Sequence, residues 1–342
     1  MQECPTLRVL GVLSIDSTGW QVLESALPLA SNLRGLDMHG YRLHDDDSIE
    51  RLATLLRSLP AIETLDLQWN SIGAHDAQIL TSALPPSLLS LALGHNQLSD
   101  DGCAFIASAL HNHSRLERLD LSVNHVQANG ARALARLLRS NIVLTSLDLL
   151  GNHLRNDGVE YLLAALNGHS ALRTLNVFGN GITNIDSILQ PDLPLHSIDV
   201  GNNAIGDAGA LVLANLLRAN PVLSSLYLQH AQIGNAGVDA LATALTSNSH
   251  LQVLSLAGVE GVLIQDNGAS ALARALLQNT GVRELYLWSN AIGDAGARAL
   301  ANAMEHNMGV RVLDLRLNAP ITAQGGRALL KVAAAGRAQI FL

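Results

Sequence analysis

Few residues in this chain have catalytic or metal-binding potential, and their spacing matches no familiar reaction centre. A phosphate-binding loop needs a lysine after a glycine-rich turn, but the only lysine, Lys331, follows a leucine. Cys4 and Cys103 are too few for a disulfide framework or a cysteine zinc site. His125 and His153 are 28 residues apart and should lie near each other, but two histidines without a third ligand make a weak metal site. We therefore expect no catalytic residue, no cofactor and no metal ion.

Two further histidines and Cys103 have simpler structural interpretations. His111 and His113 lie where a predicted helix gives way to a loop, so we expect them to face solvent. Cys103 takes a helix position that small residues hold elsewhere, so we expect a packed, unreactive thiol.

Composition and charge exclude several classes of protein. Hydrophobic residues make up 48% of the 342 residues and charged residues 15%, which argues against intrinsic disorder. No apolar run reaches the length of a membrane span, and the first residues lack the pattern of a secretory signal. The net charge of −8 argues against nucleic-acid binding, because phosphate contacts need a clustered basic surface. We expect a cytoplasmic protein with no nucleic-acid or membrane partner.

A repeated pattern of the form L-x-x-L-x-L-x-x-N-x-I/L runs along the whole chain. Its first position recurs twelve times, at Leu7, Leu33, Ile62, Leu88, Leu116, Leu144, Leu172, Leu195, Leu223, Leu251, Val282 and Val310. Six of the eleven intervals equal 28 residues. This period indicates a solenoid of twelve stacked coils, so we predict one domain over residues 1–342 rather than several globular domains.

Each coil is predicted to contain a short strand followed by a helix. In coil 11, apolar residues alternate over residues 285–288, as a strand buried on one side requires. Residues 293–301 then change to helical spacing, with Asp294 as a candidate N-cap for the first free amides. Neighbouring strands lie about 4.8 Å apart, whereas helix axes need about 8 to 10 Å, so the stack must bend. The predicted fold is an α/β horseshoe with a parallel concave sheet and outer α-helices.

Three segments depart from the repeat. Coil 7, near residues 172–194, is only 23 residues long and ends in two prolines, which prevent a regular helix. Coil 10 carries an insertion near residues 257–263, which is either a tolerated loop or a partner contact. Residues 338–342 are predicted to form a last strand that covers the end of the core.

Asparagine occupies the ninth position of eight coils, where a buried amide can bond the backbone as the chain turns. These residues are Asn70, Asn96, Asn124, Asn152, Asn180, Asn203, Asn290 and Asn318. We interpret this ladder as structural.

These residues together resemble the leucine-rich repeat. The 28-residue period with a full helix resembles the ribonuclease-inhibitor-like subclass, which also occurs in the repeat regions of NOD-like receptors. The G-A-x-x-L-A phrase at residues 296–301 is similar to GALA-type leucine-rich-repeat effectors of plant-pathogenic bacteria. The resemblance covers residues 7–342 and is highly specific for the fold but weakly specific for function.

Positions 3, 5, 7 and 8 of each coil are predicted to point away from the core and to form the concave surface. Half of the ten aromatic residues fall there, namely Trp69, Phe178, Tyr227, Tyr286 and Trp288. Exposed aromatic anchors supply binding energy at protein interfaces. The preference of aromatic residues for strands is the competing explanation.

Position 5 carries a column of acidic residues on the same surface. The column consists of Asp37, Asp66, Asp120, Asp148, Asp199 and Asp314. Adjacent coils should place Asp37 beside Asp66 and Asp120 beside Asp148, a like-charge arrangement that a basic partner would relieve. Aspartate at this position is also common in leucine-rich repeats, so a purely structural role remains equally open.

We interpret the chain as a non-catalytic scaffold that binds a partner protein, with a basic surface as one option, on its concave face. The five aromatic residues would anchor the partner. Steering and register are assigned to Asp66, Asp120, Asp148, Asp199 and Arg316. The identity of the partner and the oligomeric state are left open.

Three alternatives remain. The architecture also resembles Ran GTPase-activating proteins, and the chain is equally consistent with the sensing region of a larger NOD-like receptor. A bacterial effector secreted into host cytosol is the third. The 20 arginines against a single lysine fit either a GC-rich genome or an effector that offers almost no ubiquitin acceptor.

Overall fold

The chain divides into two compact units, unit 1 at residues 1–176 and unit 2 at residues 177–342. The computed structural model describes residues 8–12, 17–41, 43, 47–167, 171–185, 192–258 and 261–342. The predicted start of coil 1 at Leu7, and Cys4, lie outside the described residues. The expectation of a single domain over residues 1–342 stays a prediction.

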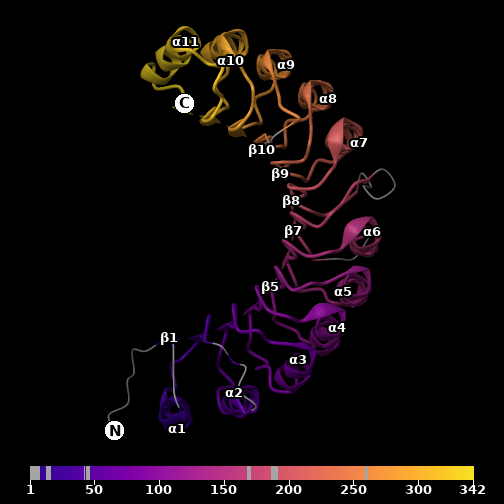
Figure 1. Ribbon diagram of the computed structural model, residues 1–342, viewed down its shortest axis with the longest axis vertical. Coiled ribbons are helices and arrows are strands. Elements are labelled where there is room, and N and C mark those ends of the chain that lie inside the picture. The colour runs from indigo at the N-terminus through magenta and orange to yellow at the C-terminus, as the bar shows by residue number, and fades with distance from the viewer. Residues whose placement is uncertain are drawn as a thin grey trace. The chain divides into compact units, whose positions relative to one another are not determined.

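Unit 1 is a stack of strand–helix coils. Its elements are β1 (Val9–Gly11), α1 (Ser17–Ala26), a 3-10 turn (Leu27–Leu29), β2 (Gly35–Asp37), α2 (Ser48–Arg57), β3 (Thr64–Asp66), α3 (Ala74–Thr81), β4 (Ser90–Ala92), α4 (Ser99–Leu110), β5 (Arg118–Asp120), α5 (Ala128–Ser140), β6 (Ser146–Asp148), α6 (Arg155–Ala165) and β7 (Thr174–Asn176). Each strand pairs in parallel with the next one along the chain. The strands line one side of the stack and the helices the other (Figure 1).

Unit 2 repeats this arrangement. Its elements are β8 (Ser197–Asp199), α7 (Gly206–Ala219), β9 (Ser225–Tyr227), α8 (Asn235–Leu245), β10 (Val253–Ser255), α9 (Asp266–Leu276), β11 (Glu284–Tyr286), α10 (Asp294–His306), β12 (Val312–Asp314), α11 (Ala323–Ala334) and β13 (Gln339–Phe341). Strands β8 to β13 are parallel and lie in chain order. We call the sheet surface opposite the helices the inner face of each unit.

The twelve predicted strands are confirmed, and each occupies positions 3 to 5 of its coil. The predicted last strand at residues 338–342 is confirmed as β13. The architecture is thus the predicted leucine-rich-repeat solenoid of parallel strands and outer helices. No helix of the described part of the chain is both long and apolar enough to cross a membrane.

The core of each coil is aliphatic. In coil 6, Leu144, Leu147 and Leu149 are at most 1% exposed, and burying such a side chain contributes about 1.5 to 3 kcal/mol. Trp20 is the only aromatic residue in the buried core of the described chain. The aromatic side chains therefore lie mostly outside the core.

The asparagine ladder at position 9 is confirmed. The Oδ1 atom of Asn152 accepts hydrogen bonds from the amides of Asn124 and Val126 in the preceding coil, at 3.0 and 2.9 Å. Its Nδ2 atom donates to the carbonyl oxygens of Leu121 and Leu149, at 2.9 and 3.0 Å. One buried side chain thus satisfies four backbone groups where the strand ends.

A second ladder lies where each helix returns to the sheet, three residues before position 1. Its buried members are Asn141, Asn220, Asn248, Asn279 and Asn307. Asn279 accepts from the amides of Gly281 and Val282, at 3.0 and 2.9 Å, and donates to the carbonyl of Leu245 in the preceding coil at 2.8 Å. The recurring spacing is visible in the sequence, but our sequence interpretation missed it.

His113 takes the same place at the end of coil 4, so the expectation that it faces solvent is wrong. It is half-buried, and its Nδ1 atom accepts from the amide of Leu116 at 3.1 Å. Since an amide can only donate, Nε2 carries the proton and donates to the carbonyl of Pro85 at 3.1 Å. The imidazole therefore replaces an asparagine amide in the ladder.

The interpretation of Asp294 as the N-cap of its own helix is also wrong. Gly293 is the N-cap of α10, and Asp294 is the first helical residue. The Oδ1 atom of Asp294 instead accepts from the amides of Thr322 and Gly325 in the next coil, at 2.8 and 2.9 Å. Each such carboxylate caps the helix of its neighbour rather than its own.

The same cross-coil cap recurs along both units. The other acceptors are Asp100, Asp207, Asn235 and Asp266. The Oδ1 atom of Asp266 lies 2.7 Å from the Gly293 nitrogen and 2.8 Å from the Gly296 nitrogen. A Cβ at position 296 would lie 2.8 Å from the same oxygen, so this approach requires glycine. The recurring Asp/Asn-x-Gly phrase is therefore a packing device.

The irregular segments are described in part. The described residues between β7 and β8 contain no helix, as expected for the short coil 7, but residues 186–191 lie outside the described part. Val259 and Glu260 of the predicted insertion also lie outside it.

We expect Asp266→Ala to lower the free energy of unfolding by about 1 to 2 kcal/mol, because two amides at the start of α10 lose their acceptor. Chemical denaturation measures the change. Asp239→Ala is the matched control, since Asp239 is an exposed aspartate on α8 in a surface ion pair with Arg274, and such pairs contribute about 0 to 1 kcal/mol. An equal effect of the two substitutions would contradict the cross-coil cap.

Candidate protein-binding surfaces

The predicted acidic column lies on the inner faces as expected. In unit 1 the strand register places Asp37 opposite Asp66 and Asp120 opposite Asp148. Both predicted like-charge pairs are therefore adjacent. In unit 2, Asp199 lies opposite Tyr227.

These aspartates also have a structural role. In each case Oδ1 accepts a hydrogen bond from the amide two residues further along, where the strand turns out of the sheet. The six bonds join Asp37 to His39, Asp66 to Gln68, Asp120 to Ser122, Asp148 to Leu150, Asp199 to Gly201 and Asp314 to Arg316, at 2.8 to 3.1 Å. The column is thus built into the fold, and its carboxylates are held in place by the turn amides.

Asp148 lies in the least favourable environment for a charge. Burial is the main cause that raises the pKa of its carboxyl group, and neighbouring Asp120 raises it further. Hydrogen bonds from the Leu150 amide and from Asn176 act in the opposite direction. A nearby cation would therefore stabilise the ionised form of the Asp148 carboxyl group.

In unit 1 the predicted aromatic anchor is Trp69, which is 58% exposed. Its ring stacks on the ring of His95, with centroids 3.7 Å apart and planes 9° from parallel. His95 holds the same position 8 in the next coil, so the repeat could have indicated this partner. Sequence reasoning missed it because it considered aromatic residues one coil at a time.

In unit 2 the four predicted aromatic residues are half-buried rather than fully exposed. Phe178 leans over the next coil, where a Cβ at Gly201 would lie 2.9 Å from its ring. The Trp288 ring meets His230 edge-on, with centroids 5.4 Å apart. The Tyr286 hydroxyl donates to Glu284 at 2.7 Å.

Arg316 does not project freely into the predicted interface. Its guanidinium group bonds the buried carboxylate of Asp314, with Nη2 and Oδ2 2.5 Å apart. It also lies over the Phe341 ring, 5.4 Å from the centroid. Arg316 therefore connects Asp314 on β12 with Phe341 on β13.

The histidine pair of coils 5 and 6 lies together as predicted. The rings of His125 and His153 have centroids 5.7 Å apart. In the part of the chain that the structure describes, no three His, Cys, Asp or Glu side chains form a group that could hold a metal ion. Cys103 is buried, and burial raises the pKa of its thiol, as the expectation of a packed cysteine implies.

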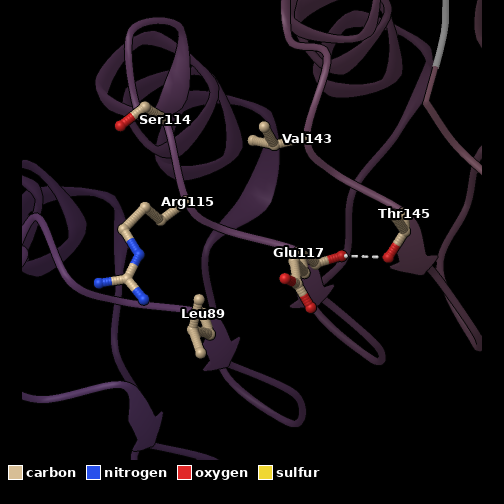
Figure 2. Close-up of a pocket in the computed structure, with 6 residues that line it drawn as sticks. All are labelled: Leu89, Ser114, Arg115, Glu117, Val143 and Thr145. Carbon is tan, nitrogen blue, oxygen red and sulfur yellow. Dashed lines mark hydrogen bonds between the residues drawn. The ribbon is translucent and has the colours of Figure 1, made fainter.

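A shallow hollow of about 340 Å³ lies where strands β4 to β6 begin. Figure 2 shows Leu89, Ser114, Arg115, Glu117, Val143 and Thr145 around it. The Thr145 hydroxyl donates to the backbone carbonyl of Glu117 at 3.1 Å (Figure 2). Arg115 and Glu117 are exposed, and the hollow has no buried, activated group of the kind that catalysis uses.

Comparisons with known proteins agree with this geometry. Seven segments match the family model of the leucine-rich repeat, at residues 85–107, 112–135, 140–163, 194–214, 219–242, 278–301 and 306–330. Pig (Sus scrofa) ribonuclease inhibitor is 28% identical over 326 residues, which cover 86% of this chain and 66% of that protein. The chain thus contains leucine-rich repeats and is similar to ribonuclease inhibitor.

Two further comparisons add less. RAN GTPase-activating protein 2 of Arabidopsis thaliana is 33% identical over 85 residues, 24% of this chain and 16% of that protein. The leucine-rich-repeat protein thus spans less than two thirds of each of these two curated relatives. An internalin from Listeria monocytogenes str. 4b F2365 superposes with a TM-score of 0.57 at 20% identity, covering 98% of this chain and 86% of that one. The internalin likeness concerns the fold alone.

We expect Asp148→Asn to stabilise this leucine-rich-repeat protein at pH 7, by up to about 1 kcal/mol. The raised pKa means that the folded state favours the protonated carboxyl, so its contribution is present at low pH and is lost as pH rises through that pKa. The gain should therefore shrink below about pH 4, where the wild-type side chain is also neutral.

Chemical denaturation of the wild type and the variant at pH 7 and at pH 3.5 measures the difference in their free energies of unfolding at each pH. Asp239→Asn on the exposed face of α8 is the control. A variant less stable than wild type at pH 7 would show that the ionised carboxylate is needed in the fold.

Proposed function

We propose that this leucine-rich-repeat protein is a non-catalytic scaffold that binds another protein on its inner faces. The observation that carries the proposal is the placement of Trp69, Phe178, Tyr227, Tyr286 and Trp288. These large side chains lie on the inner faces, while the core is filled by aliphatic residues. Half-exposed aromatic groups on a rigid sheet lose little entropy on binding and serve as anchors.

The charges of the inner faces suit a partner with a basic surface. Asp66, Asp120 and Asp148 project from unit 1, and Asp199 projects from unit 2. Their carboxylates are held by the turn amides, so a cation approaching them meets an ordered array. Arg316 is neutralised by Asp314 and sets the C-terminal limit of the acidic column in unit 2.

Similarity to ribonuclease inhibitor supports this kind of role, because the name of that relative describes a protein that acts on another protein. It suggests a ribonuclease as one partner to test. An effector role in host cytosol, and a place in a larger NOD-like receptor, are narrower versions of the same scaffold function. The single lysine, Lys331, is exposed on α11 beside Glu305.

We expect the double substitution Tyr286→Ala and Trp288→Ala to weaken binding of a captured partner by more than about 2 kcal/mol, because two anchors are removed. The affinity is measured by calorimetry with a partner first isolated on the wild-type protein. The control is Phe105→Ala with Tyr161→Ala, which removes two aromatic residues from the outer helices α4 and α6. Wild-type affinity of the first variant, with its melting curve unchanged, would overturn the proposal.

A GTPase-activating function is the second candidate, and one observation favours it, the 33% identity with RAN GTPase-activating protein 2 over 85 residues. Single-turnover GTP hydrolysis by small GTPases, with and without this protein, decides between the two. An unchanged hydrolysis rate across the set removes the second candidate.

A further inference from the structure

Four side chains of unit 2 form one aromatic surface on its inner face. We call Tyr227, His230, Tyr286 and Trp288 the aromatic plateau. Tyr227 and Tyr286 lie on β9 and β11, and both are paired in register with Ser255 of the strand between them. His230 and Trp288 meet edge-on across the same coil.

The plateau exists because coil 10 has only small side chains at positions 5, 7 and 8 of its inner face. Its residues at positions 5, 7 and 8 are Ser255, Ala257 and Gly258, and all three are buried. Side chains of coils 9 and 11 therefore close over coil 10 from both sides. With strands about 4.8 Å apart, Tyr227 and Tyr286 originate about 10 Å from each other, which places two ring systems within reach of one partner side chain.

A carboxylate lies at the edge of the plateau. Glu284 accepts the Tyr286 hydroxyl through Oε2 at 2.7 Å, and it forms no ion pair with any residue that the structure describes. This hydrogen bond, together with burial, raises the pKa of Tyr286 to about 12, so the phenol stays neutral and keeps donating to the carboxylate. Negative charge next to electron-rich ring faces attracts a cation from two directions.

The same unit already contains one cation bound in this manner. Arg316 bonds the carboxylate of Asp314 and lies over the Phe341 ring on the neighbouring strand. The plateau offers the same two partners, a carboxylate and rings, but no guanidinium group of the described chain occupies it. Arg283, the residue before Glu284, donates instead to the carbonyl of Gly309 at 3.0 Å.

Coil 9 holds two buried polar atoms close in sequence to Tyr227. Gln229 Oε1 and His230 Nδ1 are buried and have no hydrogen-bond partner among the described residues. The Gln229 amide is already oriented, because its Nε2 atom donates to Asp199 at 2.9 Å. Its oxygen can only accept a hydrogen bond.

We propose that the aromatic plateau binds a cationic side chain, preferably the guanidinium group of an arginine, presented by the partner protein. This inference rests on the proposed scaffold function and adds the chemistry of the group recognised in unit 2. The cation lies against the rings of Tyr286 and Trp288 and pairs with Glu284. Arginine is preferred to lysine because its planar group stacks on rings while its N–H groups bond a carboxylate.

The probe is a labelled Gly-Ser peptide with four evenly spaced arginines, compared with the same peptide carrying citrulline, which keeps the shape and loses the charge. Fluorescence anisotropy with the full chain gives both affinities. We expect the arginine peptide to bind at least tenfold more tightly than the citrulline peptide. We expect a lysine version to fall between them.

Variants separate the plateau from general attraction to an acidic protein. Trp288→Leu and Glu284→Gln should each weaken arginine-peptide binding at least fivefold, and the amide introduced by the second substitution can still accept the Tyr286 hydroxyl. The matched controls Tyr161→Leu on the outer helix α6 and Glu117→Gln remove an aromatic ring and a carboxylate from unit 1 and should change the affinity less than twofold. Circular dichroism checks that each variant is folded.

Three outcomes overturn the inference: equal binding of the arginine and citrulline peptides, wild-type affinity of both plateau variants, or preference for an acidic peptide. If partner binding still depends on Tyr286 and Trp288 in these cases, the scaffold function stands and only the cationic ligand is wrong. If partner binding is independent of those two residues, the scaffold function itself fails.

Discussion

The structure depends on hydrogen bonds that side chains of one coil make to the backbone of a neighbouring coil. A strand of three residues satisfies few of its own polar groups, and the backbone turns at both asparagine ladders are buried in the described residues. Asn152 at the strand end and Asn279 at the helix end each bond amides and carbonyls on both sides. Without such side chains these buried groups would be unpaired, at a cost of about 1 to 3 kcal/mol each.

The carboxylate caps extend this rule to the outer helices. Asp266 holds the first amides of α10, and Asp294 holds those of α11, so the preceding coil completes the start of each of these two helices. Glycine follows from the same contact, because a Cβ at position 296 would meet the Asp266 carboxylate. Hydrogen bonds to otherwise unpaired backbone groups therefore connect neighbouring coils, in addition to the burial of leucine.

Because backbone and leucine contacts secure the fold, the inner faces are available for recognition. The acidic column has a structural role, since one oxygen of each aspartate accepts a hydrogen bond from a turn amide, and in the proposed function Asp66, Asp120, Asp148 and Asp199 also face the partner. The aromatic side chains have no comparable role in the core. Their grouping in unit 2 depends on coil 10, where Ser255 and Ala257 leave room for larger neighbours.

The sequence by itself determined the strand positions, the first asparagine ladder, the last strand and the adjacent aspartate pairs. These follow from a fixed repeat, because residues at equal positions in successive coils must stack. Only the tertiary structure decided which coil each polar side chain serves: Asp294 caps its neighbour, and His113 replaces an asparagine. It also decided that Trp69 stacks on His95 and that Trp288 meets His230. Such contacts depend on the space that neighbouring coils leave, which a pattern within one coil does not contain.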